Sequence, residues 1–154
     1  MKRFIALAAV STAFIAGPAS AQLYLGVGAG EPRPDHSEVS WKALVGMQVT
    51  PMFGGEVAYH NFGEEGNADF DAESVAGTGT MALDRNWALV GKVGVVRLHA
   101  GPADDTNLYL GAGIRYALTP NVGLSLDYEN FGKATRLGTD NRLSNVGLNA
   151  QYIF

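Results

Sequence analysis

The chain has 154 residues, of which 11 are basic and 15 acidic, so that its formal net charge is −4, and it contains no cysteine. This acidic balance argues against nucleic acid as a partner. The lack of cysteine excludes disulfides and thiolate metal sites, and no motif indicates a cofactor. Stability must therefore come from backbone hydrogen bonds and from the surrounding medium.

The N-terminus has the three-part layout of a secretory signal peptide. Lys2 and Arg3 precede an apolar run over residues 4–16, and the small residues Ala19, Ser20 and Ala21 follow. The run has roughly 13 residues, whereas a transmembrane helix needs about 20. We therefore predict a signal peptide over residues 1–21, cleavage, and a mature domain over residues 22–154 with a net charge of −6.

After this region the chain divides into eight segments of about ten residues, most of which alternate apolar and polar residues as strands do. In residues 39–50 the apolar set includes Val39, Trp41 and Val45, with Leu44 as an exception to the alternation. The pattern in residues 73–82 is weak and leaves open which set faces outward. The segments are residues 22–30, 39–50, 54–62, 73–82, 86–97, 107–118, 121–131 and 142–154.

The connections between these segments alternate in length. Short turns with proline or aspartate are expected near residues 50–53, 83–85 and 119–121. The other four connections, "EPRPDHSE", "GEEGNADFDA", "LHAGPADDT" and "GKATRLGTDN", are longer and polar. Short turns on one side and long loops on the other are typical of outer-membrane barrels. The sequence thus predicts an all-β protein, an eight-stranded antiparallel up-and-down transmembrane β-barrel.

The last segment ends on an aromatic residue, with Val146, Leu148, Ala150, Tyr152 and Phe154 on one face. In a closed barrel this strand pairs with the first strand, which leaves no free sheet edge. Phe154 would then face the lipid at the periplasmic interface. Two girdles of outward aromatic residues are expected, one made of Trp41, Tyr59 and Tyr128 and the other of Trp87, Tyr116, Tyr152 and Phe154.

Three stretches resemble the transmembrane domain of the OmpA family and its small outer-membrane relatives. They are "GGEVAYHNFG", "NLYLGAGIRYALTPNVGLSLDYENFG" and the terminal "GLNAQYIF". The resemblance implies that the barrel assembly machinery reads the terminal strand through Tyr152 and Phe154, after delivery by periplasmic chaperones. It also implies an outer-membrane location. Because no segment follows Phe154, we expect the chain to lack the periplasmic peptidoglycan-binding domain of full-length OmpA proteins.

The interior of an eight-stranded barrel is only wide enough for its own side chains. Polar side chains on the inward face of the predicted strands indicate a polar lumen. In it, Arg115 should lie opposite Ser125 and within reach of Asp127. Such a network could be a structural plug or the gate of a narrow ion pore. The gating pair of the OmpA family cannot be transferred, because Arg115 and Ser125 replace its glutamate and arginine. The charged lumen candidates are Lys42, Glu56, Lys92, Arg115, Asp127 and Glu129.

Acidic residues concentrate in or beside the long connections, which predicts a negative extracellular rim. The rim could bind lipopolysaccharide through divalent cations, bind a basic host or phage surface, or only keep the loops solvated. "NADFDA" places Asn67, Asp69 and Asp71 like the first calcium ligands of an EF-hand, but Ala72 and Thr78 break that motif. The rim residues are Glu31, Asp35, Glu38, Glu64, Glu65, Asp69, Asp71, Glu73, Asp104, Asp105 and Asp140.

Three histidines, His36, His60 and His99, are expected near the extracellular end, where barrel enzymes that modify lipid A hold catalytic histidines. No serine shares an outward face with His60, so we expect no enzyme and keep lipid A modification as an alternative. "GVGAG" lacks the spacing of a dinucleotide site, and the polar inward set disfavours a soluble ligand-binding barrel. We expect a structural and surface-interaction protein, with the gated pore as the first alternative.

Overall fold

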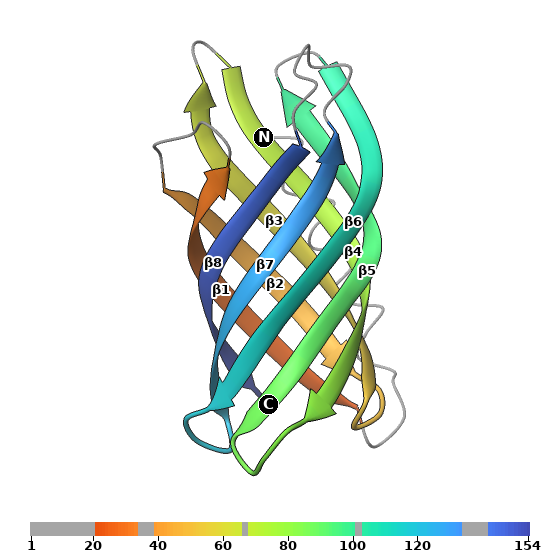
Figure 1. Ribbon diagram of the computed structural model, residues 1–154, viewed down its shortest axis with the longest axis vertical. Coiled ribbons are helices and arrows are strands. Elements are labelled where there is room, and N and C mark those ends of the chain that lie inside the picture. The colour runs from red at the N-terminus through yellow and green to blue at the C-terminus, as the bar shows by residue number, and fades with distance from the viewer. Residues whose placement is uncertain (1–20, 34–38, 66–67, 101–102, 134–141) are drawn as a thin grey trace.

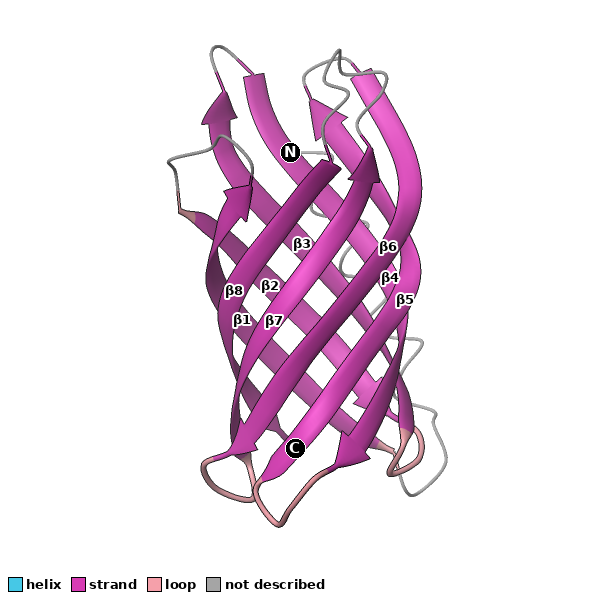
Figure 2. Cartoon of the chain, in the orientation of Figure 1, coloured by secondary structure: helices cyan, strands magenta, loops and turns pink. Residues whose placement is uncertain are grey.

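The chain forms a closed barrel of eight strands (Figures 1 and 2). The computed structural model describes residues 21–33, 39–65, 68–100, 103–133 and 142–154, so the predicted signal peptide lies outside it except for Ala21. No helix among the described residues is long and apolar enough to cross a membrane. The strands are β1 (Gln22–Arg33), β2 (Ser40–Gln48), β3 (Phe53–Glu65), β4 (Ala68–Ala82), β5 (Trp87–Ala100), β6 (Ala103–Ala117), β7 (Val122–Lys133) and β8 (Arg142–Ile153).

Each strand pairs in antiparallel fashion with its neighbour in the sequence, and β8 pairs with β1 to close the barrel. Tyr24 lies opposite Ile153, and the N–H of Phe154 donates to the carbonyl of Leu23 at 2.9 Å. The C-terminus therefore lies at the end that carries the short turns (Figure 1). This arrangement confirms the predicted fold class, an eight-stranded antiparallel barrel.

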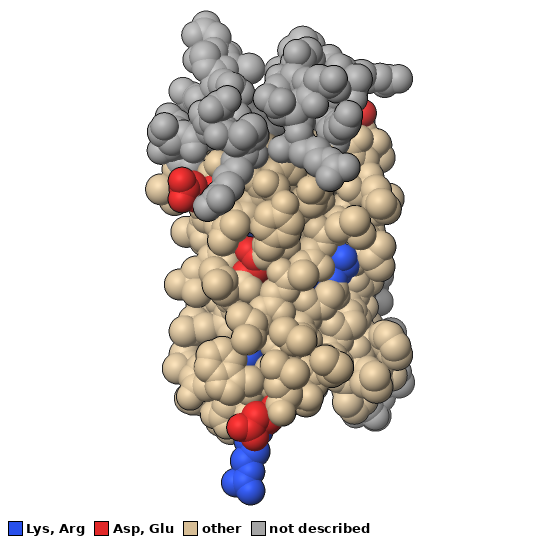
Figure 3. All heavy atoms as spheres, in the orientation of Figure 1, with Lys and Arg blue, Asp and Glu red and all other residues tan. Residues whose placement is uncertain are grey.

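Alternate side chains point into the lumen or outward, as the pleat of a strand requires. In β2, Ser40, Lys42 and Leu44 are buried while Trp41 is exposed, so the leucine that broke the alternation faces the lumen. In β4, where the sequence left the facing open, the even-numbered residues from 72 to 78 are buried. The outward set is mostly apolar, and uncharged residues cover most of the wall seen in Figure 3.

Two of the four expected long loops are largely strand. β3 runs to Glu65 and β4 starts at Ala68, while β5 runs to Ala100 and β6 starts at Ala103. The prediction was wrong because polar side chains do not prevent backbone pairing where the strands extend beyond the apolar wall. The predicted loop between β7 and β8 falls on residues 134–141, which lie outside the described residues.

The sequence Tyr-X-Asn-Phe-Gly occurs twice, at residues 59–63 in β3 and 128–132 in β7. In each copy the asparagine Oδ1 accepts a hydrogen bond from the glycine N–H, at 3.1 Å in β3 and 3.0 Å in β7. The two glycines have φ of 88° and 79°, a left-handed conformation that glycine adopts without strain. The strand register shifts at both places, so each copy interrupts the pairing with a bulge, beyond which the pairing resumes.

Candidate functional site in the barrel lumen

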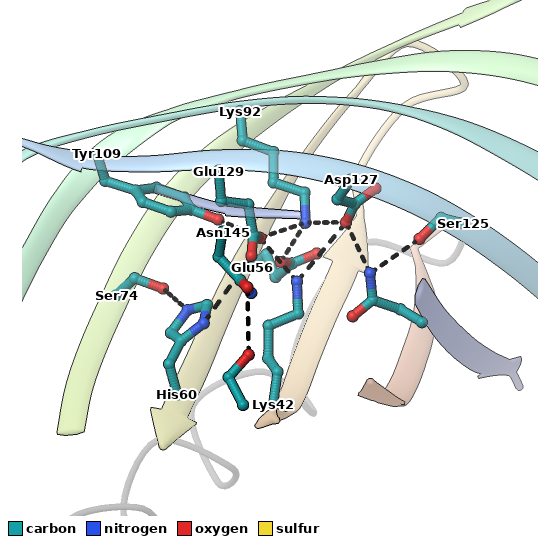
Figure 4. Close-up of polar contacts among 12 residues, drawn as sticks. Lys42, Glu56, His60, Ser74, Lys92, Tyr109, Ser125, Asp127, Glu129 and Asn145 are labelled. Atoms are coloured by element: carbon teal, nitrogen blue, oxygen red, sulfur yellow. Dashed lines mark hydrogen bonds and ion pairs between the residues drawn. The ribbon is translucent and has the colours of Figure 1, made fainter. Parts of the chain in front are cut away.

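Five charged side chains from four strands meet near the middle of the lumen (Figure 4). The Lys92 ammonium donates to Glu56 at 2.7 Å and to Asp127 at 3.0 Å, and lies 3.5 Å from Glu129. The Lys42 ammonium donates to Glu129 at 2.7 Å and lies 3.6 Å from Asp127. All five residues are 4% exposed or less. We call these five residues the lumen network.

Two tyrosines complete the hydrogen bonding of the network glutamates. Tyr24 donates to Glu56 at 3.2 Å, and Tyr109 donates to Glu129 at 2.5 Å. Tyr24 of β1 can reach Glu56 of β3 because residue 46 of the intervening β2 is glycine, where a Cβ would lie 2.1 Å from the tyrosine Cζ. Each buried carboxylate thus has both a cationic and a neutral donor, which limits the cost of burying its charge.

Asp127 has a neutral donor as well. The amide of Asn149 donates to it at 3.1 Å and to the hydroxyl of Ser125 at 3.4 Å. Gly113 faces Asp127, and a Cβ there would lie 2.1 Å from the aspartate Oδ1. Glycine at this position therefore makes room for the carboxylate, a requirement that the strand alternation alone did not reveal.

Arg115, the sixth residue expected in the lumen, does not join the network. It lies opposite Ser125 as predicted, but its expected pairing with Asp127 is wrong, because no ion pair links Arg115 to a carboxylate of the described ranges. Asp127 instead accepts a hydrogen bond from Lys92 of β5, which reaches it past β6. The guanidinium instead lies over the ring of Tyr24, 5.5 Å from the ring centroid.

On the side of the network away from the short turns, the lumen is filled by apolar side chains. The ring of Phe131 packs edge-on against Phe62 at 5.2 Å and against His60 at 4.9 Å, and lies 5.5 Å from Tyr109. Phe62 and Phe131 are the phenylalanines of the two repeated Tyr-X-Asn-Phe-Gly sequences. This aromatic plug, which the sequence did not predict, consists of Phe62, Ala72, Ala76, Val96, Leu98, Tyr109, Phe131 and Leu143.

His60 lies between a serine and a glutamate, in an order that resembles a catalytic triad. Its Nε2 is 3.1 Å from the hydroxyl of Ser74, and its Nδ1 is 3.9 Å from Glu129. The Nδ1 atom has no hydrogen-bond partner among the described residues, and Ser74 is only 2% exposed. A substrate could not reach this serine beneath the plug, so the geometry does not support nucleophilic catalysis.

A second charged cluster lies where β5 ends and β6 begins, at the end of the barrel opposite the short turns. Arg97 donates to Asp104 at 2.7 Å, and the Nδ1 of His99 lies 2.6 Å from the other oxygen of that carboxylate. Hydrogen bonds from His99 and Arg97 hold the pKa of Asp104 below its usual value. Nearby, Tyr59 donates to Asp71 at 2.9 Å. The cluster is partly charge-balanced, so this part of the rim is less negative than the sequence suggested.

The structure describes only some of the predicted rim residues. No group of three or more His, Asp or Glu able to hold a metal ion occurs in the parts of the chain that the structure describes. Asp71 of the calcium-like stretch is hydrogen-bonded to Tyr59. Outside the described residues lie Asp35, His36, Glu38, Asn67 and Asp140, and the side chains of Glu64, Glu65 and Asp69 are also not described.

The outer wall carries aromatic side chains near both ends. The rings of Trp41 and Tyr59 lie 5.5 Å apart, on the side away from the short turns. At the other end, Trp87 and Tyr116 lie 4.7 Å apart, and Tyr152 and Phe154 lie 5.0 Å apart. Tyr128 also faces outward, with 49% of its surface exposed. The grouping of the outward aromatic side chains into two levels, with an apolar wall between them, stays a prediction.

The wall is recessed where small residues lie side by side. Gly79 lies opposite Gly91, and Gly91 lies opposite Ala112. Phe53 and Met81 are among the residues that border the resulting apolar groove, which has a volume of about 590 Å³. A Cβ at either glycine would meet nothing within 4 Å. The groove opens to the medium around the barrel and is separate from the lumen network.

Comparisons with known proteins show the fold. No protein-family model and no curated protein matches the chain. Three solved structures illustrate the likeness: the N-terminal barrel domain of Pseudomonas aeruginosa OprF (TM-score 0.66, 10% identity, 86% of this chain and 97% of that chain), Yersinia pestis Ail with the heparin analogue sucrose octasulfate (0.59, 17%, 87% and 97%), and Neisserial surface protein A (0.57, 17%, 87% and 97%). The fold is thus that of small eight-stranded outer-membrane barrels.

Proposed function

We propose that this chain, with the fold of the small outer-membrane barrels, is exported by an N-terminal signal peptide and inserted in the outer membrane of a Gram-negative bacterium. There it acts as a structural and surface-interaction protein, not as an enzyme. The apolar wall between two levels of aromatic side chains supports the location, because such side chains suit a hydrocarbon layer and its interfaces.

The filled lumen is the observation that carries this function. The lumen network occupies its middle, and the aromatic plug closes its extracellular side with Phe131 and Leu98 at 0% exposure. Ion conduction needs a continuous hydrated path. The plug therefore favours the structural role over the gated pore, and leaves the extracellular strand ends as the surface available to partners.

The partners of this surface follow from its chemistry. The wall contacts membrane lipid, and the charged strand ends lie at the level of lipopolysaccharide, where they can also meet a host or phage surface ligand. Ail binds a heparin analogue in one of the similar structures. The exposed Tyr152 and Phe154 in the closing strand suit recognition by the barrel assembly machinery.

The surface role is tested by neutralising the rim. Cells that express the full chain should adhere to host cells and exclude hydrophobic dyes better than cells with an empty vector. Replacing three rim acids together, Asp71→Asn, Glu73→Gln and Asp104→Asn, should lower adhesion severalfold without changing the amount of folded barrel. Asp84→Asn, on an exposed turn at the opposite end, serves as the control. If the wild type differs from the empty vector in neither assay, the proposed function is wrong.

The membrane location makes a separate prediction for the wall. Leu126 of β7 is 51% exposed and faces outward between the two aromatic levels. Leu126→Arg should lower the free energy of unfolding in bilayers by about 2–4 kcal/mol, because it places a charge in hydrocarbon. Leu118→Arg, on a short turn with 50% exposure, should cost about 1 kcal/mol or less. Urea titrations of refolded protein in lipid vesicles measure both values, and equal losses would contradict the location.

A further inference from the structure

The lumen near the short turns holds polar groups without partners. Gln151 of β8 is 3% exposed, and neither atom of its side-chain amide makes a hydrogen bond within the described parts of the chain. The buried Nε of Arg115 in β6 likewise has no partner there. A buried polar group without a hydrogen bond costs about 1–3 kcal/mol. Such groups in a folded protein indicate a water molecule or a ligand that the protein binds.

The two side chains occupy neighbouring lumen positions because a glycine separates them. Gly123 of β7 lies opposite Gln151, and Arg115 lies opposite Ser125, the next inward residue of that strand. The stem of Arg115 lies over Gly123, since a Cβ there would be 3.9 Å from both Cγ and Cδ of the arginine. With no side chain at position 123, nothing on β7 stands between the guanidinium and the amide.

The charge of Arg115 is not balanced from within the described lumen. Glu56 and Asp127 bind Lys92 instead, and the guanidinium rests over the ring of Tyr24. A partly buried cation without a carboxylate partner attracts an anion from solution. Arg115 is partly exposed and lies close to the end of β6 at Ala117, so small solutes can reach it from the turn end.

The donors and acceptors of this pair define the ligand. A guanidinium only donates hydrogen bonds, whereas an amide both donates and accepts. A ligand that satisfies both therefore has anionic oxygens and also an O–H group. We propose that Arg115 and Gln151 form a binding site for a hydrogen phosphate group at the turn end of the lumen, which is the periplasmic end in the proposed location. The group can be free phosphate or the phosphomonoester of a lipid headgroup.

The site is tested with ¹⁵N-labelled protein purified from the membranes of cells that express the full chain. The side-chain signals of Arg115 Nε and Gln151 Nε2 are followed by NMR as inorganic phosphate is added at constant ionic strength. We expect a saturable shift of both signals with phosphate. Sulfate has the same charge and shape but no O–H group near neutral pH, and should bind at least tenfold more weakly.

Two variants and a control assign the site. Arg115→Met and Gln151→Leu should each weaken phosphate binding at least tenfold, measured by calorimetry, while Arg85→Met on an exposed turn should leave it unchanged. Heat-modifiable gel migration shows whether each variant is folded. If one variant does not fold, the difference between phosphate binding and sulfate binding by the wild type decides whether the proposal holds.

Two outcomes of the NMR titration would contradict the proposal. Signals that respond to neither anion would mean that water fills the site, and equal responses to both would mean that no O–H group is recognised. Either result overturns the proposal.

The source of the phosphate group is resolved by short-chain lipids. Dihexanoyl phosphatidic acid carries a phosphomonoester, whereas its methyl ester, dihexanoyl phosphatidylmethanol, carries a diester with no O–H group. Competition by phosphatidic acid that exceeds that of inorganic phosphate supports a headgroup site, and the reverse order supports free phosphate. Equal competition by the diester overturns the hydrogen phosphate assignment. None of these outcomes depends on adhesion or on the surface role.

Discussion

Replacing Lys92 with methionine is expected to lower the free energy of unfolding by about 3–5 kcal/mol, the cost of breaking a buried ion pair from one side. The Lys92 ammonium lies within 3.5 Å of Glu56, Asp127 and Glu129. Without it, Lys42 alone would face three buried carboxylates. Urea titration of the refolded protein in lipid vesicles, followed by tryptophan fluorescence, measures the loss.

Arg97→Met is the matched control for this substitution. Arg97 donates to Asp104 at 2.7 Å, as short as the contact of Lys92 with Glu56, but the pair is about half exposed. An exposed ion pair contributes about 0–1 kcal/mol, so this variant should unfold near the wild-type urea concentration. The double variant Lys92→Met with Glu56→Gln should recover part of the loss, since one unpaired charge is removed. A loss for Lys92→Met no larger than for Arg97→Met would show that the network is not tightly paired.

Phe131→Ala should have the second large effect, a loss of about 3–5 kcal/mol in the free energy of unfolding. Phe131 is 0% exposed and contacts the rings of Phe62, His60 and Tyr109. Deleting its ring leaves a cavity between the lumen network and the extracellular mouth. Phe53→Ala is the control, because Phe53 is 63% exposed on the outer wall and its loss leaves no enclosed cavity.

The same variant distinguishes the structural role from the pore. In planar bilayers the wild type should give no discrete openings, because the plug excludes water from the extracellular half of the lumen. Phe131→Ala should at most produce brief openings of low conductance, because the lumen network still fills the middle. Stable openings of the wild type that change in Arg115→Ala would instead support the gated pore and contradict the proposed role.

The alternation of residues predicted the lumen side of most strands, but the contacts depend on the whole barrel. Lys42 and Glu129 are 87 residues apart in sequence and come from β2 and β7. The alternation of residues predicts that both side chains face the lumen. Whether they meet depends on barrel closure and on the stagger of the strands. The same reason explains the error at Arg115. The turn between β6 and β7 sets the register of Arg115 as predicted, but Lys92 reaches Asp127 from β5, which lies outside that hairpin.

Two features that were not predicted, the aromatic plug and the serine beside His60, have signals in the sequence. The repeated Tyr-X-Asn-Phe-Gly is visible at residues 59–63 and 128–132, and an inward phenylalanine before a glycine could have indicated an apolar plug. The serine next to His60 had a weaker signal. Ser74 comes from the segment with poor alternation, and it contacts the histidine only because β3 and β4 pair in this register.

The strand number, the antiparallel order, the position of the short turns and the apolar outer wall could be predicted from the amino-acid sequence. These properties depend on local periodicity and turn chemistry, which neighbouring residues encode. The length of the strand extensions, the pairing within the lumen network, the closure by Phe62 and Phe131, and the isolation of Arg115 beside Gln151 became visible only in the folded barrel. Long side chains from strands that are not neighbours compete for the same few partners in a narrow lumen, and the outcome depends on distances that no local pattern contains.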